Sequence, residues 1–185
     1  ECAAGQPEHD ALTTIVIEGE FNMKPFHACC AALCLSMLMP AFSNAQSPAD
    51  FTAEAASFNQ FEVEASRLAL KSAQDDATKM FANDIMRDHE KALVDLADAA
   101  KKDGTSVPTD LSTEYAEKMR ALETASQSEF DQAYLSTQVS VLEDAKTMFE
   151  AFIKTGIAGS LRAYAENQRG TVRTYNVRVQ GLTNP

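Results

Sequence analysis

Apolar residues recur at helical spacing along most of this chain, and this pattern limits what the chain can fold into. In the first such segment they follow one another at intervals of three, four or seven residues: Phe51, Phe58, Phe61, Ala65 and Leu68. Such spacing places side chains on one face of an α-helix. No stretch after residue 46 shows the apolar–polar alternation of a half-buried strand. The pattern predicts an all-α protein.

Capping residues and glycines divide the pattern into five helices. Ser47 followed by Pro48 is typical of a helix start, and Gly104 is typical of a helix end. Residues 126–129, Ser-Gln-Ser-Glu, have the sequence of a capping box, which favours another helix start. The predicted helices cover residues 47–73, 75–103, 112–125, 126–156 and 159–180.

Four of the predicted helices are long, and each has a single apolar face, so they must pack together to be stable. The connection over residues 104–126 is long enough to cross a bundle from end to end. We therefore expect a ferritin-like four-helix bundle, with an extra short helix in the crossover between the second and third long helices.

The N-terminal part reads as an export signal. Within residues 23–45, a lysine precedes the apolar stretch 26–42, and small residues lie just before Gln46. The alternative is a membrane anchor, but a span needs about 20 apolar residues, and Pro40 interrupts this stretch. We expect residues 1–22 to lie upstream of the true start and residues 23–45 to be a cleaved signal peptide. The helical domain is then 46–185, with its core in 49–182.

Charge and cysteine content narrow the function of residues 46–185. This part has 15 Lys and Arg against 22 Asp and Glu, a net charge of −7, and no cysteine. An acidic surface argues against nucleic acid and anionic lipid as partners and tolerates basic partners or cations. No transmembrane segment is expected in the mature chain. We expect it in the periplasm, with association with the outer membrane as an alternative.

His89 is the only histidine of the mature chain, and its helical neighbours Ile85, Met86 and Leu93 are apolar. Inward-facing Glu and His side chains hold metals in helical bundles. The candidate metal ligands are therefore Glu62, Glu64, Asp88 and His89. A second interpretation is a core histidine that is hydrogen-bonded to a carboxylate such as Glu62 or Glu64. A third is a pH switch, because the reference pKa of histidine is about 6.5.

Other polar residues suggest structure rather than catalysis. Gln138 and Gln168 fall on apolar helix faces, where we expect interhelical hydrogen bonds. Arg162, Arg169, Arg173 and Arg178 give the last helix a basic stripe, which suits a salt-bridged face or a partner. Nucleotide loops, nucleophile elbows and zinc-ligand spacings are missing from the sequence, so no catalytic residue is predicted.

Residues from about 51 to 182 resemble a bacterial exported domain-of-unknown-function family, often labelled "predicted outer membrane protein". The matching stretches are 61–64 with 68–69, 81–82 leading to 88–92, and 126–135. The resemblance implies a ferritin-like fold and a role in envelope stress tolerance. Members of that family commonly carry a histidine on each of three long helices. Here only His89 is kept, because the other two positions fall at Leu142 and near Tyr175.

These observations favour a non-enzymatic protein of the bacterial envelope that acts by binding or by structural interaction. No cofactor is expected, although a weakly bound divalent metal fits the four candidate ligands. The expected partner is an envelope protein or a small cation. The alternative is a ferritin-like metal-binding protein or oxidase with a degenerate site around His89.

Overall fold

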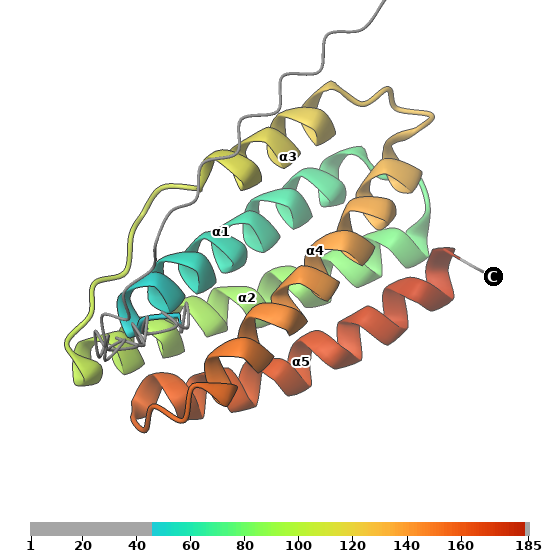
Figure 1. Ribbon diagram of the computed structural model, residues 1–185. Coiled ribbons are helices and arrows are strands. Elements are labelled where there is room, and N and C mark those ends of the chain that lie inside the picture. Colours follow the sequence, from blue (N-terminus) through green and yellow to red (C-terminus); the bar gives the residue numbers. More distant parts are fainter. Residues whose placement is uncertain (1–45, 184–185) are drawn as a thin grey trace, which may run out of the picture. The chain divides into compact units, whose positions relative to one another are not determined.

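The computed structural model describes residues 46–183, and within this range the chain forms five α-helices and no strand (Figure 1). The helices are α1 (Pro48–Ser72), α2 (Asp76–Asp103), α3 (Thr113–Thr124), α4 (Phe130–Lys154) and α5 (Ser160–Thr183). The all-α prediction is therefore confirmed for this range. The expected upstream sequence 1–22 and signal peptide 23–45 lie outside the described residues.

Most helix ends follow from the capping residues. The Ser47 side chain accepts a hydrogen bond from Asp50 N, and Asp75 accepts one from Thr78 N. Gly104 ends α2 with φ of 74°, a left-handed conformation that glycine adopts without steric cost. These starts and stops agree with the sequence prediction.

The start of α4 corrects the capping-box prediction. The helix begins at Phe130, and its first turn receives no side-chain cap from Glu129. Ser126 Oγ instead donates a 2.6 Å hydrogen bond to the Glu129 carboxylate, while Glu129 N bonds to the Ser126 carbonyl. The serine and the glutamate thus close a turn on each other rather than capping backbone N–H groups.

The four long helices pack in a ring in which α1 contacts α2 and α4, and α5 contacts α2 and α4 (Figure 1). The end of α1 lies beside the start of α4, because Asp131 accepts hydrogen bonds from Gln74 N and Asp75 N. At the other end, Asp103 at the close of α2 accepts hydrogen bonds from the first residues of α5. Residues 104–129 therefore carry the chain from one end of the ring to the other.

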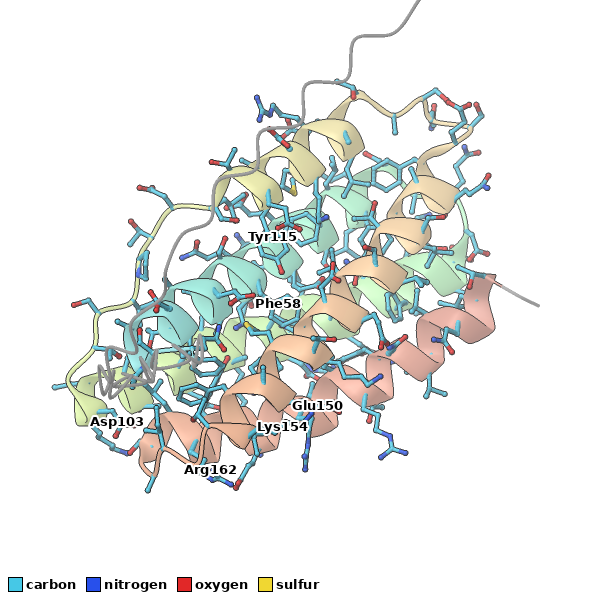
Figure 2. The ribbon with its side chains drawn as sticks, viewed as in Figure 1. Phe58, Asp103, Tyr115, Glu150, Lys154 and Arg162 are labelled. Atoms are coloured by element: carbon cyan, nitrogen blue, oxygen red, sulfur yellow. The ribbon has the colours of Figure 1, made fainter. Side chains whose placement is uncertain are left out.

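The short helix α3 lies within this crossover and packs on α1 and α4. Tyr115, Met119 and Leu122 are its buried residues, and the Tyr115 ring lies 5.1 Å from the ring of Phe61. Figure 2 shows Tyr115 projecting from α3 toward α1, with Phe58 inside the ring of long helices. The core is rich in aromatic side chains that are no more than 2 % exposed: Phe51, Phe58, Phe61, Phe81, Phe130, Tyr134, Phe149 and Phe152.

None of the described helices is both long and apolar enough to cross a bilayer.

Candidate functional site

The middle of the bundle contains a fully buried polar group around His89. The His89 ring nitrogen Nδ1 lies 2.8 Å from Oδ1 of Asn59, and both residues are 0 % exposed. The Asn59 amide nitrogen donates to the Ala55 carbonyl and, at 2.9 Å, to the Tyr164 hydroxyl. Because the side-chain oxygen of Asn59 can only accept a hydrogen bond, Nδ1 of His89 must carry the proton in this contact. Helices α1, α2 and α5 are thereby joined by one hydrogen-bonded chain.

The remaining nitrogen of His89, Nε2, has no hydrogen-bond partner among the described residues. Aromatic rings pack against the imidazole: Phe58 edge-on at 5.1 Å and Tyr175 at 6.3 Å. Burial lowers the pKa of His89 to about 4, despite the opposing charge of Asp88. At neutral pH the ring is therefore neutral, with Nδ1 protonated and a lone pair on Nε2.

A second buried pair joins α1 to α4. Gln138 Nε2 donates a 2.7 Å hydrogen bond to Oε2 of Glu62, and both side chains are 0 % exposed. Burial raises the pKa of Glu62 to about 8, against the effect of the Gln138 hydrogen bond. The carboxyl group is consequently protonated at neutral pH. The other oxygens, Glu62 Oε1 and Gln138 Oε1, have no partner in the described part of the chain.

Two of the four predicted ligands lie outside this interior. Glu64 is exposed on α1. Asp88 is half-exposed and accepts hydrogen bonds from the Tyr175 hydroxyl at 2.6 Å and from Arg87 at 3.1 Å. Partial burial raises the pKa of Asp88, but these two hydrogen bonds, together with the positive charge of Arg87, hold the pKa below its ordinary value.

The structure thus separates the four candidates. Glu62 and His89 face the interior, where each is hydrogen-bonded to one side-chain amide. Glu64 and Asp88 lie toward solvent. Residues 46–183 contain no group of three or more His, Cys, Asp or Glu side chains placed to hold a metal ion. A site made of all four residues stays a prediction.

Several contacts differ from the sequence interpretation. The partner of His89 is the amide of Asn59 rather than a carboxylate, because Asn59 lies opposite His89 on α1. The interhelical hydrogen bond of Gln138 is confirmed, whereas Gln168 Oε1 has no partner among the described residues. Sequence reasoning missed Asn59, which sits at position i+8 from Phe51 on the apolar face, a placement that could have identified it.

The basic stripe on α5 is partly paired. Arg178 bonds to Asp84 on α2 at 3.0 Å and lies over the Phe81 and Tyr175 rings, and Arg162 pairs with Glu166 at 3.0 Å. Arg162 also donates a 2.8 Å hydrogen bond to the Ile153 carbonyl, where α4 ends and α5 begins.

Fold and interior together define a class: an all-α bundle protein with an end-to-end crossover and a core that buries neutral polar pairs. The chain matches the family described as "Domain of unknown function (DUF4142)" over residues 37–182, and it belongs to that family. A comparison with curated proteins gives no match.

A solved structure supports the fold. The crystal structure of a DUF305 fragment from Deinococcus radiodurans superposes with a TM-score of 0.65 at 14 % sequence identity. The match covers 75 % of this chain and 97 % of that chain. At this identity the similarity concerns the fold alone.

Proposed function

We propose that this protein is a non-enzymatic binding protein of the bacterial envelope, with its long helices in a ferritin-like arrangement. The proposal places the mature chain in the periplasm, free or in contact with the outer membrane, and connects it with envelope stress tolerance. Its partner is an envelope protein or a small cation.

One observation carries this proposal: the interior positions that would hold metal ligands in a ferritin-like bundle are occupied by groups that bond to each other. Glu62 is engaged by Gln138, and His89 by Asn59. Leu142 and Tyr175, where the family resemblance implies histidines, supply a buried apolar side chain and a ring packed near His89. Leucine has no atom that binds a metal, and the Tyr175 hydroxyl already donates its proton to Asp88 at 2.6 Å. Recognition by the surface is therefore the function that this interior supports best.

The test uses the protein purified from the periplasm of the bacterium that makes it, after chemical cross-linking in intact cells. Support would be recovery in the periplasmic fraction together with a stoichiometric, cross-linked envelope partner. Recovery in the cytoplasm, or robust metal-dependent turnover by the purified protein, would overturn the proposal.

A specific observation favours a second candidate, a degenerate metal site. His89 Nε2, with its lone pair, and Glu62 Oε1 are both buried polar atoms without a partner among the described residues. Elemental analysis of the native protein beside a His89→Ala variant tests this candidate. A stoichiometric metal that disappears in the variant would support it. Metal well below one ion per chain in both proteins would end it.

A further inference from the structure

A groove on the outside of the bundle, between α1 and α4, has a volume of about 920 Å³. It begins where α3 begins, and its wall on α1 runs from Asp50 to Ser57, a length of about 10 Å along the helix. Because α3 has only 12 residues and α1 and α4 have 25 each, α3 can cover no more than about half of the face between them. The groove lies on the uncovered part.

The floor of this groove is apolar. Its small side chains are Ala53, Ala145 and Ala151, and Met148 and Tyr115 lie beside them. Ala151 is exposed and Ala53 is half-buried, so apolar surface on α1 and α4 faces solvent here. On the covered part of the same face, the amphipathic helix α3 packs against α1 and α4 through Tyr115, Met119 and Leu122. An amphipathic helix is the shape that this face already accepts.

The rim of the groove is acidic. None of its lining residues is a lysine or an arginine. The four exposed carboxylates that line it are Asp50, Glu54, Glu114 and Asp144. Outside the lining, Lys118 pairs with Glu114 at 3.1 Å. The other three carboxylates have no cationic partner within the described residues: Glu54 bonds to Gln46, Asp50 to Ser47, and Asp144 to Ser140.

We propose that this groove binds a cationic amphipathic helix of a partner protein, which continues the layer of α3 along the α1–α4 face. The apolar side of the partner helix covers the alanine floor, and its lysines or arginines meet the carboxylates of the rim. Partial burial raises the pKa of Glu54, and the nearby Glu114 raises it further, against the Gln46 hydrogen bond. A cation in the groove would relieve this repulsion. The inference rests on the proposed binding function and names the chemistry of its partner.

A defined peptide tests the groove. The probe is a synthetic helical peptide of about 12 residues, long enough to span the groove, with leucines on one face and lysines beside them. Its binding to the purified protein is measured by fluorescence anisotropy at low and moderate salt. We expect saturable binding that weakens with salt, because the rim charges are exposed and screened. The same peptide with glutamates in place of lysines is expected not to bind.

Matched variants locate the site. The double reversal E54K/D144K is expected to weaken binding by about tenfold or more. The control E117K/E123K changes the net charge equally on exposed residues of α3 that do not line the groove, and should leave Kd within about twofold. Ala151→Trp fills the floor without changing charge and should also weaken binding. Ala97→Trp, at an exposed position on α2, is its control. Circular dichroism checks that each variant is folded.

Several outcomes would overturn the inference. The first is no binding of the lysine peptide at low salt, and the second is equal weakening by both charge reversals. The third is competition by spermine, a polyamine without an amphipathic helical face, that is as strong as competition by the unlabelled peptide. Self-association in sedimentation that E54K/D144K abolishes would make a second copy the occupant and equally reject a partner helix. Failure of the groove leaves a cross-linked envelope partner unaffected. Failure of the proposed function shows as the absence of that partner while the peptide still binds.

Discussion

The side chain of Gln138 on α4 donates its amide proton to the carboxyl group of Glu62 on α1, with 2.7 Å between nitrogen and oxygen, where neither residue reaches solvent. A charged carboxylate at such a position would be costly, because one amide hydrogen bond does not replace its hydration. The raised pKa of Glu62, about 8, has this origin. The pair therefore joins α1 to α4 as a neutral acid and a neutral amide.

The first prediction concerns alkaline stability. Glu62→Gln keeps the size of the side chain and removes its ionisation. The pKa of Glu62 in the folded protein, about 8, lies above the ordinary value of 4.5. The stability that neutral Glu62 provides is therefore complete below pH 4.5 and is lost as the pH rises to 8. From this residue alone, the free energy of unfolding should fall by up to about 1.4 kcal/mol per pH unit in that window.

Urea unfolding of the two proteins at pH 5 and pH 8 measures the effect. The variant should be comparable to wild type at pH 5 and more stable by several kcal/mol at pH 8. Glu64→Gln, at an exposed position on the same helix, is the control and should leave the pH dependence unchanged. Parallel pH profiles for wild type and Glu62→Gln would show that Glu62 is ionised inside the fold.

The second prediction concerns acid. The folded pKa of His89, about 4, lies below the ordinary 6.5, so the unfolded chain binds the proton first. The stability that neutral His89 provides is present above pH 6.5 and is lost as the pH falls toward 4. His89→Asn keeps an N–H donor near the position of Nδ1 and cannot titrate.

In wild type the opposite slopes of Glu62 and His89 overlap between pH 4.5 and 6.5, so the histidine is best observed in the Glu62→Gln background. There, unfolding free energies should rise from pH 4 to 6.5, and adding His89→Asn should remove much of that rise. An equal rise in both proteins would mean that the imidazole titrates normally, and the acid sensitivity would then have another source.

The sequence predicts the helices well because their signals are local. The cap of Ser47, the stop at Gly104 and the apolar spacing of α1 depend on residues within one or two turns. Burial of His89 also follows from spacing along one helix. The predicted start of α4 is wrong because the same local pattern has two structures. Ser126 and Glu129 have the order of a capping box, but in the fold they bond to each other and close a turn.

The choice of partners across the core could not be predicted in the same way. The partner of His89 depends on how α1 and α2 are displaced along their axes, and that brings Asn59 rather than Glu62 opposite the imidazole. Glu62 then faces α4, where Gln138 lies. The groove beside α3 likewise depends on where a short helix rests on two long ones, which amphipathic spacing leaves open.

The third prediction compares two tyrosine hydroxyls, one bonded to a fully buried amide and the other to a half-exposed carboxylate. Tyr164→Phe removes the acceptor of Asn59 Nδ2 and leaves one amide proton unpaired in the core, which should cost about 1–3 kcal/mol. Tyr175→Phe removes the hydroxyl that donates to Asp88, a carboxylate that water can reach, so its cost should be smaller. Chemical unfolding at pH 7 provides the comparison. Equal losses would contradict the role of Asn59 as a buried link.

The fourth prediction concerns the joint between α2 and α5. The Asp103 carboxylate accepts hydrogen bonds from Ser160 N at 3.0 Å and Leu161 N at 2.7 Å, and these bonds hold its pKa below the ordinary value. It occupies the place of a helix cap, although it comes from another helix. Asp103→Ala should therefore destabilise the protein by about 1 kcal/mol, the usual value of a lost cap.

Gly159 makes this joint testable by a double-mutant cycle. A Cβ on Gly159 would meet Asp103 Oδ2 at 2.5 Å, and φ of 145° is a conformation that other residues rarely adopt. Gly159→Ala should be costly in wild type and less costly in Asp103→Ala, where the clash is absent and only the backbone strain remains. The double variant should therefore lose less free energy of unfolding than the sum of the losses of the two single variants. Additive losses would show that Asp103 does not press on this turn.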